Sequence, residues 1–202
     1  MRLIPKIDFD KIRGIILFGF KKNIIVEKNC IIKRPKTINF GGNNYIARFS
    51  EIHSSEPGKI SIGKNTRICR HNFIFDSSGF IKIGDDCLIG DYCTIYGHGG
   101  VIIGNNVVFA SHVNVIASEH NYKDINLSIL KQPSTHKGIK IGDGSWLGIN
   151  VTVLDGSEIG KNCVIGASSI VKGNIPDYSV AVGVPAKVVK YYNQEKKDWV
   201  KS

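Results

Sequence analysis

Residues 141–172 read IGDGSW LGINVT VLDGSE IGKNCV IGASSI VK, in blocks of six that each begin with an apolar side chain. The same spacing recurs upstream, and the apolar positions fall into groups of three: 62/68/74, 83/89/95, 103/109/115, 141/147/153 and 159/165/171. A helix would place apolar residues three and four positions apart, and a lone strand would alternate them without a six-residue beat. Six residues match one short strand followed by one turn.

A second rhythm has a period of eighteen residues. The residue after the apolar position is small in the first two blocks of a group, as in Gly142 and Gly148, and larger in the third, as in Leu154. Small residues let the chain bend tightly, so two corners are tight and the third accepts insertions. We therefore predict an all-β parallel solenoid of triangular coils, with three blocks to a coil and apolar rungs inside. The spacings 26/32/38 and 46/52 indicate further coils upstream.

Composition narrows the class of protein. The 202 residues suffice for one domain with a core, and 42% hydrophobic with 22% charged residues is typical of an ordered soluble chain. No apolar run approaches the ~18 residues of a membrane span, and no export signal is evident, so we expect a cytoplasmic protein. Nothing in the sequence matches a nucleotide-phosphate loop.

The positive charge is confined to the ends of the chain. Residues 1–40 contain ten Lys or Arg against three Asp or Glu, and residues 186–202 contain five against two. The remaining residues contain twelve of each, so the body is neutral. Because a nucleic-acid binder spreads basic residues over its folded face, we predict no nucleic-acid partner. A phosphate-bearing small molecule, an acidic membrane or solubility alone could explain the basic ends.

The five cysteines form no CxxC pair, which argues against a zinc knuckle or a redox motif. Four of them fall at the small inward position of a block and the fifth follows an inward residue. We interpret all five as reduced core residues: Cys30, Cys69, Cys87, Cys93 and Cys163.

Two further segments carry a family resemblance. Residues 139–148 read IKIGDGSWLG, and residues 183–190 read GVPAKVVK. With the repeats, over about residues 60–190, they resemble the hexapeptide-repeat acetyltransferases, above all the galactoside and maltose O-acetyltransferases and the sugar O-acetyltransferases of capsule and lipopolysaccharide assembly. The resemblance implies a left-handed parallel β-helix, a homotrimer with active sites between subunits, acetyl-CoA as co-substrate and no metal.

The largest insertion, about residues 117–138, falls at the third corner. Loops of this length in compact domains are usually functional or disordered. Its apolar residues suggest that it packs on something, such as a neighbouring subunit; they are Ile125, Leu127, Ile129 and Leu130.

His120 is the candidate catalytic residue. The segment 119–122 matches the family's acidic-His segment, in which the His is the general base. An imidazole with a pKa near ~6.5 can accept a hydroxyl proton as the hydroxyl attacks a thioester. Glu119 could hold the imidazole, although adjacent residues of an extended chain point opposite ways. The candidate acceptor-binding residues are Asp91, Tyr92, Glu119, Asn121 and Tyr122.

The resemblance also implies a coenzyme A groove. Trp146 would lie beside the acetyl arm or at a subunit interface, the amide of Ile149 would face the oxyanion, and the backbone of Ala167 would contact pantetheine. Basic residues would meet the nucleotide end; they are Lys172, Lys187 and Lys190.

Three segments are expected along the chain. Residues 1–25 form a cap on the solenoid or an amphipathic segment in contact with a membrane. Residues 26–185 form the β-helix, and residues 186–202 form a tail with a short, charged C-terminal helix at 187–198.

The resulting hypothesis is an acetyl-CoA-dependent O-acetyltransferase that acts directly on a sugar or a cell-surface polysaccharide precursor. One alternative is N-acetylation of an amino-sugar nucleotide. A second is a β-helical zinc enzyme of carbonic-anhydrase type, which would need three converging imidazoles. A third is a scaffold without catalysis. The acceptor itself stays open.

Overall fold

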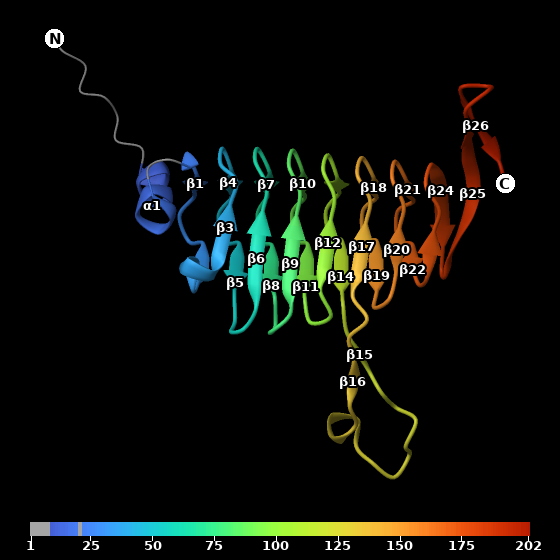
Figure 1. The fold of residues 1–202 in the computed structure, drawn as a ribbon, viewed down its shortest axis with the longest axis horizontal. Coiled ribbons are helices and arrows are strands. Elements are labelled where there is room, and N and C mark those ends of the chain that lie inside the picture. The colour runs from blue at the N-terminus through green and yellow to red at the C-terminus, as the bar shows by residue number, and fades with distance from the viewer. Residues whose placement is uncertain (1–8, 20–21) are drawn as a thin grey trace.

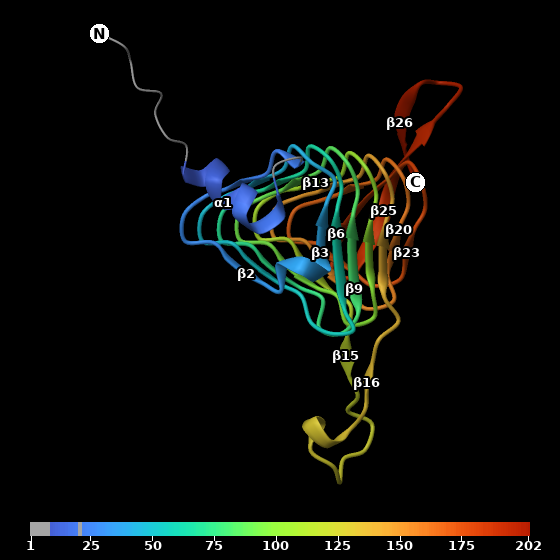
Figure 2. The same cartoon turned by 60° about the vertical axis from the view of Figure 1, so that its left-hand side comes forward.

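The computed structural model describes residues 9–19 and 22–202. The chain winds into a prism of stacked coils (Figure 1), and a view turned toward the prism axis shows their triangular outline (Figure 2). Three parallel sheets form its sides, which we call faces A, B and C in the order in which each coil crosses them. The chain turns from one face to the next at edges AB, BC and CA.

The strands of each face belong to successive coils. Face A contains β1 (Ile25–Val26), β4 (Tyr45–Ile46), β7 (Arg67–Ile68), β10 (Leu88–Ile89), β13 (Val108–Phe109), β18 (Trp146–Leu147), β21 (Val164–Ile165) and β24 (Ser179–Gly183). Face B contains β2 (Ile31–Lys33), β5 (Glu51–His53), β8 (Phe73–Phe75), β11 (Thr94–Tyr96), β14 (Asn114–Ile116), β19 (Thr152–Leu154) and β22 (Ile170–Val171). Face C contains β3 (Ile38–Phe40), β6 (Lys59–Ile62), β9 (Phe80–Ile83), β12 (Val101–Ile103), β17 (Ile139–Ile141), β20 (Glu158–Ile159) and β23 (Asn174–Ile175).

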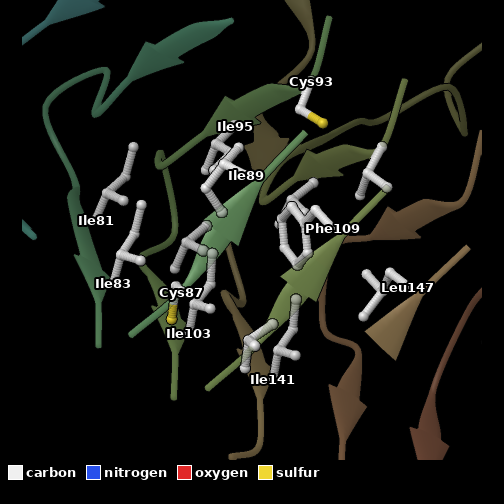
Figure 3. Close-up of a cluster of buried hydrophobic side chains, with 14 of the residues drawn as sticks. Ile81, Ile83, Cys87, Ile89, Cys93, Ile95, Ile103, Phe109, Ile141 and Leu147 are labelled. Carbon is white, nitrogen blue, oxygen red and sulfur yellow. The ribbon is translucent and has the colours of Figure 1, made fainter. Parts of the chain in front are cut away.

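The interior is a stack of apolar rungs. All fifteen positions of the five predicted groups are at most 2% exposed. On face A the rungs stack in register, because Ile89 pairs with Phe109 and Phe109 pairs with Leu147. Figure 3 shows these side chains pointing into a shared core with the Phe109 ring among the aliphatic groups. The six-residue spacing is thus confirmed as one inward rung position per strand, and most strands of face C bury a second side chain as well, as Ile81 does beside Ile83.

The insertions are at the third corner, as predicted. Edge BC carries the long loop between β14 and β17, yet the coils on either side of it stay in register. Val115 pairs with Val153 on face B, and Val101 pairs with Ile139 on face C. The solenoid therefore continues past the loop as if it were absent, and the loop projects from the body (Figures 1 and 2).

The cysteines only partly match the prediction. Cys87, Cys93 and Cys163 are buried in the core, but Cys30 and Cys69 are half-buried. Each of the three buried thiols donates a hydrogen bond to a carbonyl of the next coil, as Cys93 does to Ala110 O at 3.2 Å. Burial raises the pKa of Cys93 to about 12, so this thiol stays protonated and acts as core.

The N-terminal helix lies over the first coil. Helix α1 (Phe9–Phe18) packs on β1, and its Phe18 ring meets Phe40 edge-on with centroids 4.7 Å apart. Residues 1–8 and 20–21 of the expected cap lie outside the described residues. Membrane contact through the outer face of α1, where Phe9 and Ile16 are 65% and 76% exposed, stays a prediction that cosedimentation with anionic vesicles would test. Within residues 9–19 and 22–202, no helix is both long and apolar enough to span a bilayer.

The predicted C-terminal helix is wrong. Residues 187–198 belong to an antiparallel hairpin of β25 (Ala186–Asn193) and β26 (Asp198–Lys201), which extends face A beyond β24. β24 offers a free edge at the last coil, and Val180 and Val182 pair with Lys190 and Lys187. Tertiary pairing at that edge outweighs the local preference of a charged segment for helix.

Replacing Gly14 tests how α1 attaches. A Cβ there would overlap the carbonyl oxygen of Ile24, so Gly14→Ala must displace the helix from the first coil. We expect the free energy of unfolding to fall by about 1–3 kcal/mol in urea denaturation. Ile16→Ala, on the exposed side of the same helix, is the control and should change it by less than ~0.5 kcal/mol. Equal effects would show that α1 does not pack as described.

Candidate active site

The predicted site residues fall on two edges of the prism. His120, its neighbours and Lys172 lie on edge BC, whereas Ile149 and Ala167 lie on edge AB and Trp146 lies beside them on face A. Face B separates the two edges. A single chain therefore does not bring the predicted base and the predicted coenzyme groove together.

The loop begins and ends as a two-stranded ribbon. β15 (Glu119–His120) pairs antiparallel with β16 (Ser134–Thr135), and His120 stands opposite Ser134. The Oγ of Ser134 lies 3.5 Å from Nδ1 of His120, at the outer limit of a hydrogen bond. The imidazole is exposed to solvent, so it can reach a partner outside its own chain.

Glu119 does not hold the imidazole. Its carboxylate lies 3.8 Å from the Nζ of Lys172, at the same edge. Because successive side chains of a strand point to opposite sides, Glu119 faces Lys172 while His120 faces Ser134. Lys172 lies at the base of the loop on edge BC, whereas the strand that carries Lys187 and Lys190 extends face A, so the contact of Lys172 with coenzyme A stays a prediction.

A hollow of about 310 Å³ opens at the base of the loop. Four of the predicted residues line it together with Lys172, and they are Glu119, His120, Asn121 and Tyr122. Asn121 Oδ1 accepts a hydrogen bond from the amide of Lys123 at 3.0 Å, and Tyr122 is 71% exposed. The hollow thus brings together five of the predicted site residues with Lys123, Thr135 and Lys137, which sequence analysis did not single out.

Asp155 anchors the returning limb of the loop. Its carboxylate is 9% exposed and accepts hydrogen bonds at 2.9 Å from the amides of Lys137 and Gly138. Thr135, in the strand that pairs with β15, also approaches it, with Oγ1 at 3.4 Å. A chain of contacts thus links Asp155 to the ribbon that carries His120. Sequence analysis missed this residue, because its role depends on backbone groups.

His98 lies behind the ribbon, one coil before it. Its Nε2 is 2.7 Å from the Oγ of Ser77, and its ring stacks on that of His136 with centroids 5.3 Å apart. Burial lowers the pKa of His98, and the neighbouring imidazoles of His136 and His120 lower it further. The neutral form of the His98 imidazole is therefore favoured, so that this ring adds no positive charge beside His120.

Edge AB offers unused backbone donors. Trp146 and Ile149 are each 51% exposed, and Gly148 packs so closely on the next coil that a Cβ would lie 2.8 Å from the nitrogen of Ala167. Among the residues that the structure describes, the amides of Ile149 and Ala167 donate to no protein acceptor. Such exposed N–H groups can bind a developing oxyanion or a carbonyl of a ligand.

Asp91 and Tyr92 lie on edge AB as well, in an earlier coil, so they are not beside His120 of the same chain. Asp91 is already engaged, since it accepts hydrogen bonds from the amide of Arg70 at 2.8 Å and from its guanidinium at 3.1 Å. Burial alone would raise the pKa of Asp91, but these bonds hold it below its usual value.

Comparison with protein families identifies the repeats. Residues 138–173 match the family "Bacterial transferase hexapeptide (six repeats)", and residues 80–111 match "Hexapeptide repeat of succinyl-transferase". The putative lipopolysaccharide biosynthesis O-acetyl transferase WbbJ of Escherichia coli is 38% identical over 187 residues, which cover 88% of this chain and 84% of that protein. The chain belongs to the hexapeptide-repeat acetyltransferase family.

Other relatives agree with this assignment. Galactoside O-acetyltransferase of Escherichia coli is 30% identical over 78% of this chain and 81% of its own length. A probable acetyltransferase of Mycobacterium tuberculosis, Rv3034c, is 36% identical over 74% of this chain, which spans half of that protein. The fold matches AntD, an N-acyltransferase from Bacillus cereus solved in complex with dTDP and coenzyme A, at 21% identity and a TM-score of 0.64 over 87% of this chain and 84% of that one.

Removing the carboxylate of Asp155 tests the anchor. Asp155→Ala leaves the amides of Lys137 and Gly138 without their acceptor, so hydrogen–deuterium exchange at residues 134–138 should accelerate at least about tenfold. Displacement of the ribbon should also lower acetyl transfer. Glu158→Gln, an exposed carboxylate on the following strand, should change neither measurement. Unaltered exchange in Asp155→Ala would contradict the anchor.

Proposed function

We propose that this protein transfers the acetyl group of acetyl-CoA to a hydroxyl of a sugar or a cell-surface polysaccharide precursor, with His120 as general base. The observation that carries the proposal is the grouping of His120 with Glu119, Asn121, Tyr122 and Lys172 around one hollow at the only long excursion of the described coils. Membership of the acetyltransferase family and the names of two sugar-related relatives support it.

The reaction follows from these groups. In the tautomer that suits a base, Nδ1–H of His120 donates to the Oγ of Ser134, and Nε2 is then free to take the proton of the acceptor hydroxyl. The hydroxyl oxygen attacks the thioester carbonyl, and the amide of Ile149 donates to the oxyanion that forms. The intermediate collapses, the C–S bond breaks, and the imidazolium returns its proton to the leaving thiolate. The products are an acetyl ester and coenzyme A.

The site is completed by a second copy of the chain. The base and the amide donors lie on different edges, so a homotrimer in which edge BC of one subunit meets edge AB of the next would unite them. The tip of the loop supports this arrangement, because Ile125 and Leu130 are 94% and 88% exposed in the single chain. A neighbouring subunit would remove this apolar surface from water. Lys187 and Lys190, which are exposed on strand β25, would then bind the phosphates of coenzyme A.

Substitution of the base tests the mechanism. His120→Ala should reduce turnover by roughly two to four powers of ten, because the hydroxyl proton then has no acceptor. The exposed side chain makes few contacts, so the unfolding midpoint should not change. Lys131→Ala, in the same loop, serves as the control. Turnover equal to that of the control would refute the role of His120, and a product that resists hydroxylamine would indicate an amide and favour the N-acetyltransferase alternative.

Mixed assemblies test the shared site. His120→Ala removes the base, and Ala167→Trp fills the groove on the other edge. Each alone should be inactive, but an equal mixture refolded together should regain about a quarter of the wild-type activity, since one site in four pairs two intact edges. His120→Ala refolded with a tagged copy of itself is the control. A mixture as inactive as this control would place the whole site in one chain.

A further inference from the structure

A second hollow lies on face A and edge AB, in the N-terminal half of the prism and away from the loop. Its volume is about 350 Å³, and its polar lining consists of Glu27, Tyr45, Arg48, Arg67, Arg70 and Asp91. Three guanidinium groups against two carboxylates leave one positive charge in excess. Nothing in the proposed reaction uses these residues as a group.

The arginines are only partly neutralised. Arg48 pairs with Glu27 at 3.2 Å, and Arg70 pairs with Asp91 at 3.1 Å. Arg67 lies over the ring of Tyr45, 5.2 Å from its centroid, and has no carboxylate partner in the part of the chain that is described. A guanidinium with one carboxylate partner still has N–H donors to spare. The hollow therefore presents donors that suit an oxyanion.

The carboxylates hold the arginines in place. Glu27 accepts hydrogen bonds from the hydroxyl of Tyr45 and, at 2.8 Å, from the amide of Arg48. Although burial works in the other direction, these bonds lower the pKa of Glu27, and the bond to Glu27 raises the pKa of Tyr45 to about 12. Both carboxylates therefore stay charged and orient the cations before any ligand arrives, which reduces the entropy lost on binding.

The strand register gives the distance to the reaction centre. On face A, Arg67 pairs with Leu88, Leu88 with Val108, and Val108 with Trp146. Three strand spacings separate Arg67 from Trp146, or about 14 Å at ~4.8 Å per strand. The opposite direction leads from Trp146 through Val164 and Val180 to Lys190, so the arginines and the proposed coenzyme site lie on opposite sides of Trp146.

Four ring-bearing side chains lie along edge AB, between the arginines of the second hollow and Trp146. Phe49, His71, Tyr92 and His112 occupy the same turn position in successive coils and stack with centroids 4.6–5.1 Å apart. All four have φ between 57° and 64°, a region that Gly, Asn, Asp and His adopt more readily than Phe or Tyr. Six matching turns of edge CA meet this preference, with Asn43, Asn65, Asp86, Asn106, Gly144 and Asn162, and a further one has Tyr178. Backbone preference therefore does not explain Phe49 and Tyr92 on edge AB, where they and the two imidazoles form a column of stacked rings.

We infer that this second hollow, which we call the arginine hollow after Arg48, Arg67 and Arg70, binds the phosphate of the acceptor, so that the acceptor is a glycosyl phosphate or diphosphate. This inference rests on the proposed function. The sugar would pass along Tyr92 and His112 to reach Trp146, with its anionic end held by Arg67, Arg48 and Arg70. Nucleotide-linked and polyprenyl-linked sugars share this diphosphate chemistry.

Binding of inorganic pyrophosphate to the full chain tests the hollow without catalysis. Calorimetry at low salt should detect binding to the wild type, and Arg67→Gln should weaken it at least tenfold. Arg67→Lys should weaken it less, because it keeps the charge but loses the planar fork. Lys82→Gln removes one positive charge from face C and should bind like the wild type. A loss in Lys82→Gln equal to that in Arg67→Gln would mean that only net charge matters and would overturn the inference.

Acceptor kinetics supply the second measurement. At saturating acetyl-CoA, Arg67→Gln should lower kcat/KM at least tenfold for UDP-linked and polyprenyl diphosphate-linked sugars and leave it unchanged for free sugars. Inhibition by UDP would identify the nucleotide source, and its absence with an active polyprenyl acceptor would identify the lipid source. Equal loss on free and phosphorylated sugars, or a preference for uronates, would overturn the inference.

The two hypotheses fail in different ways. Pyrophosphate binding that depends on Arg67, in a protein that acetylates no acceptor, would refute the proposed function and keep the anion site. Acetylation of sugars with no binding of pyrophosphate would refute the anion site and keep the proposed function.

Discussion

The structure depends on one constraint, which is that the inward side chains of each strand must stack on their counterparts in the coils above and below. Ile89, Phe109 and Leu147 meet this requirement on face A, and the other faces repeat it. Burial of these rungs supplies the main stabilising term. Because parallel pairing sets the rise at ~4.8 Å per coil, the outward residues are stacked at the same interval. The solenoid therefore sets a fixed spacing between residues on its surface as well as in its core.

Free backbone donors lie on the edges because the backbone of the faces is committed to strand pairing. Strand backbones bond to the neighbouring coils, whereas turn amides can remain free. On edge AB the first coils use an acidic side chain to cap such an amide, as Glu27 does for Arg48 and Asp91 does for Arg70. The amides of Ile149 and Ala167 have no such cap within the described chain. The same turn position thus changes along one edge from an amide that a side chain caps to an amide without a protein acceptor.

The two limbs of the loop are held firmly next to the prism, whereas the tip of the loop is exposed. Near the prism, Asp155 and the β15–β16 ribbon fix its two limbs through backbone hydrogen bonds. At the far end, Gln132 is 7% exposed and bonds to the backbone of Asp124 and Leu127, while Ile125 and Leu130 face solvent. A loop with internal polar order and an unburied apolar tip is suited to contact with another surface. This arrangement keeps His120 in place without burying it.

The architecture could be predicted from the order of the residues alone. A six-residue beat with a second rhythm of eighteen identifies the inward positions, the two tight corners and the corner that accepts insertions, because each follows from a local rule about side-chain size. The sequence also pointed to the segment 119–122, which lines part of the loop hollow and is continuous in the chain.

Contacts between distant segments became visible only in the folded chain. The tail at 187–198 became a hairpin because β24 offered it a free edge, which no local pattern reveals. The pairing of Glu119 with Lys172, the anchor at Asp155 and the arginine hollow all join residues from different coils. Such contacts depend on the stacking register and on backbone groups, and backbone groups are identical in every residue. For the same reason the separation of the candidate site onto two edges could be recognised only once the coils were in place.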